Sequence, residues 1–363
     1  MGLQLIKPGT SFDFMSKRKM ALYASLIVLG LGLLSLIIRG GLQYGIDFAG
    51  GINIQIKFER EVDLNELKDA LQASGLPELR VQRFGLQMDH EYLLRVSATD
   101  QKAEEFRAQV KQGLEEHLGS GFTIQRLEMV GPKVGSDLKN KALQALFYAV
   151  LLISIYISGR FEHKWLTAGI MALGLVTGLY LLELLSVPLV FLILAALLIT
   201  LGLCWYLQLN YALGAIVALI HDVLITVGIF SILNKDFDLT TVAALLTIIG
   251  YSLNDTIVVF DRIRENLRSK KTRPLRQIIN MSVNQTLSRT LLTSGTTLLV
   301  VGALFILGGG VIHDFALALI IGILVGTYSS VFIAGSLLLG IGPTPEAEEE
   351  SAGFSPATGR AET

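Results

Sequence analysis

A short polar stretch within a long apolar run is where this sequence could do chemistry. The stretch 251–256 contains Asp255, about 15 residues after Thr240 and therefore roughly 22 Å along a helix that rises 1.5 Å per residue. Ionisable residues at such depth in a bilayer are energetically expensive and are candidates for function by default. A buried carboxylate favours its neutral form and a nearby cation favours its charged form, which is the balance a reversible proton carrier requires. We therefore predict that Asp255 carries protons.

Arg289 is the predicted counter-ion of Asp255. It lies about 18 residues before Leu307, roughly 27 Å from the outer end of the next apolar segment, so the two groups have comparable depth. A static ion pair that joins two helices is the alternative role for them. The helical face of Arg289 continues with three threonines, which could line a polar path or bond back to their own helix. These are Thr293, Thr296 and Thr297.

Further polar residues occur near this position or at a similar depth. Ser252 lies one helical turn from Asp255, and Asn254 adds another hydrogen-bonding group. His221 and Asp222 fall in the middle of another apolar run, where a structural bond between helices and a working role are both open. We treat these residues as supporting groups for proton transfer.

The composition places the chain in the membrane class. Apolar residues make up 52% and charged residues 17%, below the roughly 25% of soluble domains, and the mean hydropathy is +0.56. The net charge of −1 gives no general attraction to nucleic acid, so we expect lipids and proteins as partners and no nucleic acid. Cys204 is the only cysteine, which excludes an internal disulfide and a cysteine-based metal site. We expect no cofactor, with protons as the coupling ion.

Eight segments of the sequence are apolar enough to cross a bilayer, which takes about 20 residues. The third and fourth are separated only by residues 186–188 and could instead form a re-entrant pair. The predicted spans are 21–38, 142–158, a pair within 166–207, 211–233, 239–260, 287–307 and 315–341.

Positive charge in short segments places both termini in the cytoplasm. The basic residues 17–19 belong to a predicted cytoplasmic N-terminus at 1–20, just before the first span. After the sixth span, residues 261–286 form a predicted cytoplasmic loop rich in arginine and lysine. The acidic tail 342–363 has too few apolar residues to build a core and is predicted to be disordered.

Residues 39–141 then form one extracytoplasmic domain, in which apolar residues alternate as in strands and recur as in helices. The predicted order of strand, helix, strand, strand, helix and strand is the ferredoxin-like pattern. The bounds are 51–58, 63–74, 79–84, 91–98, 101–118 and 122–130. The predicted fold class is a polytopic α-helical membrane protein with a small α+β ferredoxin-like extracytoplasmic domain.

Four stretches resemble the SecF family of protein-translocase membrane subunits, which work with SecD. They include a Gly-Ile-Asp-Phe-Ala-Gly-Gly motif after the first span and Tyr-Ser-Leu-Asn-Asp around Asp255. The stretches are 45–51, 238–266, 288–297 and 315–334. One departure is clear. About 48 residues separate Glu162 from Tyr211, where the family passes almost directly from one helix to the next, and they contain the predicted third and fourth spans.

The resemblance implies a fold similar to half of a resistance-nodulation-division (RND) transporter, to which this chain and SecD would each supply a six-helix bundle. It implies a role in a bacterial inner membrane, where the proton gradient helps unfolded polypeptides to leave a SecYEG-type Sec channel, with YajC as a further partner. The family's proton-relay residues map onto Asp255 and Arg289, and another intramembrane aspartate is expected from SecD.

Two other classes of function are open from the sequence. An RND-type proton-driven exporter of a small molecule or lipid would bind its substrate with the domain 39–141, in a wide apolar pocket. An intramembrane hydrolase would use His221, Asp222 and a serine such as Ser294, although the sequence shows neither a nucleophile elbow nor a zinc-binding motif. We interpret the chain as a translocase subunit and not as an enzyme.

Overall fold

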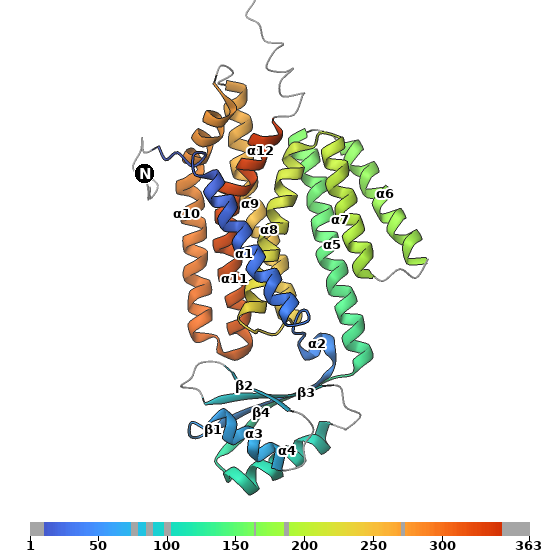
Figure 1. Cartoon of the computed structure of the whole chain (residues 1–363), viewed down its shortest axis with the longest axis vertical. Helices are drawn as coiled ribbons and strands as arrows, with labels where there is room; N and C mark the ends of the chain where they lie inside the picture. The colour runs from blue at the N-terminus through green and yellow to red at the C-terminus, as the bar shows by residue number, and fades with distance from the viewer. Residues whose placement is uncertain are drawn as a thin grey trace, which may run out of the picture.

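A computed structural model shows a bundle of long helices with a small sheet domain at one end (Figure 1). It describes residues 11–73, 79–84, 90–97, 103–162, 165–184, 189–269 and 273–342. Most of the predicted acidic tail and the first ten residues of the predicted N-terminal segment lie outside these ranges. The combination of apolar helices with a small sheet domain confirms the predicted fold class.

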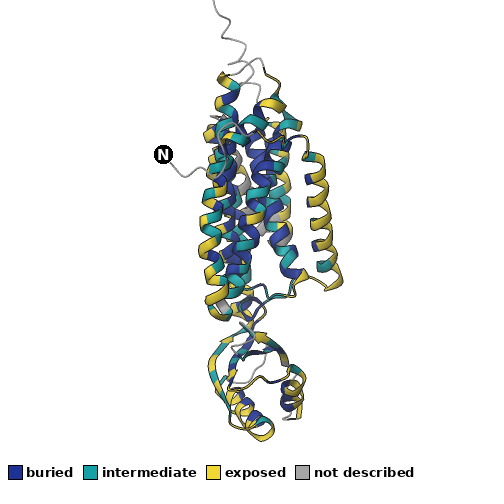
Figure 2. Cartoon of the chain, turned by 90° about the vertical axis from the view of Figure 1, so that its left-hand side faces the viewer, coloured by how far each residue is buried: buried dark blue, intermediate teal, exposed yellow. Residues whose placement is uncertain are grey.

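Within the described residues, six helical segments are long and apolar enough to cross a membrane. Five of them are α1 (Arg18–Ile38), α5 (Pro132–Glu162), α8 (Asn210–Ile232), α9 (Leu239–Ser269) and α10 (Leu275–Leu307). The sixth is interrupted, because a π-helical turn at Ser330–Ala334 separates α11 (Gly309–Ser329) from α12 (Gly335–Ile341). Buried residues fill the middle of the bundle, and exposed residues cover its outside (Figure 2).

The predicted extra pair of spans forms two helices, α6 (Trp165–Leu184) and α7 (Leu189–Tyr206), beside α5 (Figure 1). The described residues contain six segments that are long and apolar enough to cross a membrane, and the predicted total of eight spans is not confirmed. Phe161 at the end of α5 stacks on Tyr211 at the start of α8, with ring centroids 5.2 Å apart. The chain therefore leaves the bundle after α5 and returns to the same place.

The structure corrects the bounds of two predicted regions. The helix α5 begins at Pro132, within the predicted extracytoplasmic domain. The predicted loop 261–286 is largely helical, because α9 continues to Ser269 and α10 already begins at Leu275. Side-chain bonds support these extensions: the amide of Asn266 donates to the hydroxyl of Ser282 at 2.8 Å. Hydropathy predicts only the part of a helix that lies in the apolar region. It does not predict how far the helix continues beyond that region.

The sheet domain has the predicted order of elements. Four antiparallel strands pair in the order β2-β3-β1-β4, with β1 and β3 in the centre. The strands are β1 (Gly51–Phe58), β2 (Leu79–Phe84), β3 (Glu91–Ser97) and β4 (Phe122–Val130), and the helices are α3 (Leu64–Ala73) and α4 (Ala103–Leu118). Alternate residues of β1, among them Ile54, are buried against Leu67 of α3 and Phe106 of α4. This alternation forms the core that the sequence predicts.

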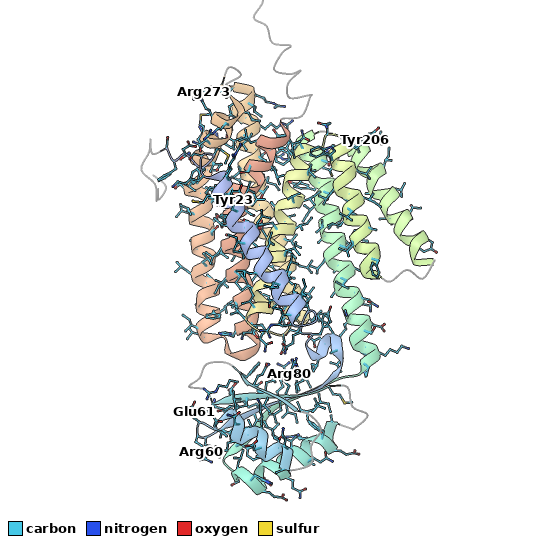
Figure 3. The ribbon with its side chains drawn as sticks, viewed as in Figure 1. Tyr23, Arg60, Glu61, Arg80, Tyr206 and Arg273 are labelled. Carbon is cyan, nitrogen blue, oxygen red and sulfur yellow. The ribbon has the colours of Figure 1, made fainter. Side chains whose placement is uncertain are left out.

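The other face of the sheet is turned toward the bundle, and Arg80 lies between the two (Figure 3). The segment before the short helix α2 (Ile46–Ala49) runs beside the connection between α8 and α9, where Tyr44 forms a parallel bridge with Phe237. Two backbone hydrogen bonds fix this contact: the Gly45 N–H donates to the Phe237 carbonyl at 2.9 Å, and the Phe237 N–H donates to the Gln43 carbonyl at 2.7 Å. The domain is thus attached directly to the segment that leads into α9.

Glycines allow the central helices to approach closely. A Cβ atom at Gly32 of α1 would lie 2.8 Å from the Cα of Gly228 in α8, and one at Gly326 of α11 would lie 2.9 Å from the Cβ of Ser252 in α9. Small residues at such contacts let helix backbones meet and let short polar side chains reach across. This packing brings together the polar groups of α1, α8, α9 and α11.

Candidate functional site

Asp255 lies in the interior of the bundle, with 3% of its surface exposed. It belongs to the face of α9 that packs against α10 and α11, together with the buried residues Ser252 and Val259 at helical spacing. The hydroxyl of Ser294 in α10 donates to Asp255 Oδ2 at 3.5 Å and lies 2.7 Å from the hydroxyl of Thr327 in α11. The carboxylate thus contacts one hydroxyl of α10, and that hydroxyl is linked in turn to α11.

Arg289 does not form the predicted ion pair with Asp255 in this chain. Arg289 is exposed on α10, and no contact of 4.0 Å or less joins its guanidinium to that carboxylate. The reason is its angular position on the helix. Ser294 faces Asp255, and a displacement of five residues at about 3.6 residues per turn turns the Arg289 side chain roughly 140° away.

The three predicted threonines bond back to their own helix. Thr293 Oγ1 donates to the carbonyl of Arg289 at 3.1 Å, Thr296 Oγ1 to that of Leu292 at 2.9 Å, and Thr297 Oγ1 to that of Thr293 at 2.9 Å. The sequence left two roles open for these threonines, which are to line a polar path or to bond back to their own helix. The structure shows the second of these. The Tyr251 hydroxyl adds one contact from α9, 3.4 Å from Thr297 Oγ1.

Asn254 is exposed on α9, whereas its neighbours in the sequence, Leu253 and Asp255, are buried. It therefore lies outside the cluster around Asp255, although it was predicted as a supporting group. Ser252 is buried and does take part in the interior, but its partner is Asp222 of α8, not Asp255.

A second cluster of polar residues surrounds Asp222, which has no exposed surface. Its Oδ2 atom accepts hydrogen bonds from the hydroxyls of Ser252 at 2.5 Å and Ser329 at 2.8 Å. Its Oδ1 atom lies 2.9 Å from Nδ1 of His221, the preceding residue of α8. The sequence predicts both members of the pair, and the structure adds the partners from α9 and α11.

The cluster continues from His221 to α1. His221 Nε2 lies 3.0 Å from the hydroxyl of Ser25, which lies 3.0 Å from the hydroxyl of Tyr328. Tyr328 in turn donates to the carbonyl of Ala21 at 2.6 Å. Sequence reasoning missed Ser25, Tyr328 and Ser329, because serine and tyrosine also occur in apolar helices without a polar partner on another helix. Thr327 was missed for the same reason.

The predicted hydrolase site is not assembled. Ser294 contacts Asp255 and Thr327, not His221. Ser25 does meet His221 Nε2 in the order of a serine–histidine–aspartate triad, but it is buried in the middle of α1. The backbone N–H groups around it belong to the helix, so they cannot form an oxyanion hole. These contacts do not support hydrolysis.

Comparison with known proteins assigns the chain to a family. Residues 35–62 match the family model of the SecD/SecF GG motif, and residues 109–202 and 176–343 match that of the protein export membrane protein SecD/SecF, C-terminal. The protein translocase subunit SecF of Magnetococcus marinus is 44% identical over 345 residues, which are 94% of this chain and 95% of the relative. The chain belongs to the SecF family.

Other SecF-family relatives and two solved structures agree with this assignment. The SecF subunit of Vibrio alginolyticus is 37% identical over 358 residues, 97% of this chain and 98% of the relative. The crystal structure of SecDF, a translocon-associated membrane protein from Thermus thermophilus, matches with a TM-score of 0.68 and 31% identity. A SecDF structure in a super-membrane-facing form matches with a TM-score of 0.56 and 31% identity. Each match covers 93% of this chain, which spans 39% of the SecDF chain.

The family assignment confirms the resemblance seen in the sequence. The two matches to the C-terminal model overlap at residues 176–202, where the sequence predicts a departure from the family pattern. Together with the apolar helices, membership of the SecF family makes the chain a multi-pass inner-membrane protein and a transport subunit.

Proposed function

We propose that this SecF-family chain is one half of a proton-driven complex, with SecD as the other half, that helps exported polypeptides to leave the Sec channel. The observation that carries the proposal is the burial of Asp255 among apolar helices, where it contacts a hydroxyl and not a cation. An ionisable group in such a place is expensive unless it works or is neutralised. Reversible protonation accounts for its presence.

The outward face of α10 supports a partner in the membrane. Arg289 is exposed there, and most residues in the apolar parts of α10 and α1 are not buried within the chain. A guanidinium that faces lipid is energetically unfavourable, whereas a carboxylate from another chain would pair with it. The likeness to SecDF makes SecD the partner we propose for this face. The SecYEG-type channel, YajC and the unfolded exported polypeptide complete the proposed set of partners.

Protonation of Asp255 then acts as a switch. A charged Asp255 attracts Arg289, and a neutral Asp255 does not, so protonation lets the two bundles shift. One charge that crosses the membrane potential supplies about 2.3 kcal/mol per 100 mV, which biases two states by roughly fiftyfold. The extracytoplasmic domain would follow, because Phe237, two residues before the start of α9, is bonded to the segment that enters the domain.

The direction of the gradient follows from the proposed topology. Arg273, in the basic region between α9 and α10, lies at the end of the bundle opposite the sheet domain (Figure 3). The start of α1 and the end of α12 lie at the same end as Arg273 (Figure 1). Positive charge favours the cytoplasmic side, so both chain ends are proposed to be cytoplasmic and the sheet domain extracytoplasmic.

A small-molecule or lipid exporter receives less support. A cavity of about 470 Å³ lies between the sheet and the bundle, but charged and polar side chains such as Asp47, Arg95 and Asp236 line much of it. The exporter hypothesis requires a wide apolar pocket instead.

The proposal is tested with Asp255→Asn in a complex reconstituted with SecD and the Sec channel. We expect the variant to assemble with SecD and to lose the stimulation of export by a proton gradient. Asp261→Asn is the matched control, because Asp261 lies on the same helix in a half-exposed ion pair with Arg160 at 3.1 Å. Export that still responds fully to the gradient in Asp255→Asn would overturn the proposal.

A further inference from the structure

The His221–Asp222 pair is a buried ionisable group that the proposed role of Asp255 does not use. The exposed fractions are 6% for His221 and 0% for Asp222, and both lie in the middle of α8. Each polar atom of the two side chains has a hydrogen-bonding contact. Because a hydrogen bond needs one donor and one acceptor, these contacts determine how many protons the pair holds.

The protons in these hydrogen bonds can be assigned one by one, starting from α1. The carbonyl of Ala21 can only accept, so the hydroxyl of Tyr328 donates its single proton there, at 2.6 Å. The oxygen of Tyr328 must then accept in its contact with Ser25, which uses the single proton of the serine hydroxyl. Ser25 therefore accepts from His221, and Nε2 of the imidazole carries a proton.

The contacts of Asp222, at the other end of this series of hydrogen bonds, determine the second proton of the pair. The hydroxyls of Ser252 and Ser329 both donate to Oδ2 of Asp222, so this oxygen acts as an acceptor. Oδ1 lies 2.9 Å from Nδ1 of His221, which is a hydrogen-bond distance and requires one proton between the two atoms. Without that proton, two lone pairs would face each other and a net negative charge would be buried in the bundle.

We infer that His221 and Asp222 form a second proton-binding site, distinct from Asp255, which holds one exchangeable proton between imidazole Nδ1 and carboxylate Oδ1. Two forms satisfy the contacts: imidazolium with carboxylate, and imidazole with carboxylic acid. Both are neutral overall and both hold the same number of protons. Release of the proton leaves neutral imidazole, protonated at Nε2, beside a carboxylate.

The geometry links this proton to the packing of four helices. The bonds of the pair reach Ser25 in α1, Ser252 in α9, and Ser329 in α11. Ser329 directly precedes the π-helical turn at Ser330–Ala334, a type of irregularity that is frequent at functional sites. Loss of the proton would remove the bond between His221 and Asp222 and so separate the α1 side of the cluster from the α9 and α11 side.

Few other titratable groups face the pair. Tyr328 of α11 stacks on the His221 ring with centroids 6.2 Å apart, and Asp255 of α9 lies one turn beyond Ser252. The charged residues of α1 and α5 lie toward the ends of those helices, and the sequences of α7, α12 and the π-helical turn contain none. The proton of the pair is thus governed by its own hydrogen bonds and by the nearby charge of Asp255. A link to export rests on the proposed function, whereas proton binding by the pair does not.

Nitrogen NMR of the full chain, labelled at histidine and embedded in lipid nanodiscs with SecD, tests the site directly. We expect His221 Nε2 to remain protonated throughout, and Nδ1 to lose its shared proton in one step as the pH rises. Infrared spectroscopy should show the accompanying change at the carboxyl group. An Nδ1 that carries no proton at any pH at which the chain is folded, beside an ionised Asp222, would overturn the inference. This wild-type measurement decides the question even if a variant fails to fold.

Asp222→Asn separates proton binding from a merely structural role. The amide of asparagine can donate to an unprotonated Nδ1 while its oxygen accepts from Ser252 and Ser329, so all the bonds persist without the exchangeable proton. We expect the NMR step to vanish and gradient-driven export to fall at least tenfold, with a normal amount of complex in the membrane. A purely structural pair predicts wild-type export instead.

Thr226→Val is the control, because Thr226 Oγ1 donates only to the backbone carbonyl of Asp222, at 2.8 Å. It should keep the NMR step and the export response. The two proposals fail separately. A wild-type response of Asp255→Asn contradicts the proposed function and leaves the NMR step in place. An absent NMR step contradicts the second site, whatever Asp255→Asn does.

Discussion

Arg95 of the sheet domain and Asp236 of the bundle form a bidentate ion pair. Nη1 lies 2.7 Å from Oδ1 and Nη2 lies 2.7 Å from Oδ2, and the side chains are only 13% and 10% exposed. Arg95 stands on the central strand β3, and Asp236 lies in the connection between α8 and α9, just before the start of the helix that carries Asp255. The amide of Gln82 adds a bond to Asp236 at 3.1 Å. The orientation of the domain is thus fixed close to the start of α9.

Removal of this ion pair should loosen the domain without unfolding it. Charge-assisted hydrogen bonds contribute about 1.5–3 kcal/mol each, so Arg95→Ala should raise hydrogen exchange in the segment around Phe237 by at least tenfold. Arg126→Ala is the control, because Arg126 pairs with Glu128 of its own strand. A charge exchange, Arg95→Asp with Asp236→Arg, should restore part of the protection. Equal exchange in all three variants would show that the ion pair does not hold the domain.

Arg289 is expected to act through a partner chain. Arg289→Lys keeps the charge but loses the planar arrangement of donors, so partial gradient-driven export should remain, whereas Arg289→Ala should abolish it. Copurification with SecD should weaken in Arg289→Ala if a carboxylate of SecD meets this side chain. Arg276→Ala is the comparison, because Arg276 lies on the same helix and pairs with Asp13 at 3.7 Å near the surface. Normal export in Arg289→Ala would exclude the predicted role.

The contact between Gly32 and Gly228 should tolerate no side chain. Gly32→Val places a Cβ 2.8 Å from the Gly228 Cα and should force α1 away from α8, at about 1–3 kcal/mol. A disulfide between cysteines placed at Ser35 and Ser231, whose hydroxyls lie 2.8 Å apart, should then form more slowly. Gly30→Val on the same helix is the matched control, because nothing lies within 4 Å of a Cβ there. Equal rates in the two variants would contradict this packing.

The domain core should depend on the buried side of β1. Ile54 is fully buried, so Ile54→Ala should destabilise the domain by about 2–5 kcal/mol through lost contacts and a cavity. Hydrogen exchange in β1 and β3 should accelerate while that of α9 and α10 stays unchanged. Lys57→Ala, an exposed position of the same strand, should have little effect. Simultaneous loss of protection in the bundle would indicate that the two parts unfold together.

The sequence alone determined the features that repeat locally along the chain. Strand alternation and helix spacing predicted the six elements of the sheet domain in order, because each follows from which side chains face one core. Apolar length located the helices, and depth within them singled out Asp255, which is buried as expected. The family followed from motifs, and the comparisons confirmed it.

The tertiary structure alone decided which polar groups meet. Depth gave Asp255 and Arg289 the same height, but a difference of about 140° around α10 directs Ser294 to the carboxylate and Arg289 to the outside. Likewise, Ser252 lies one turn from Asp255 and bonds to Asp222 of α8 instead. Sequence spacing defines the height and face of a residue on its own helix. Which neighbour that face meets depends on close contacts such as that of Gly326 with Ser252, and these exist only once the helices have packed.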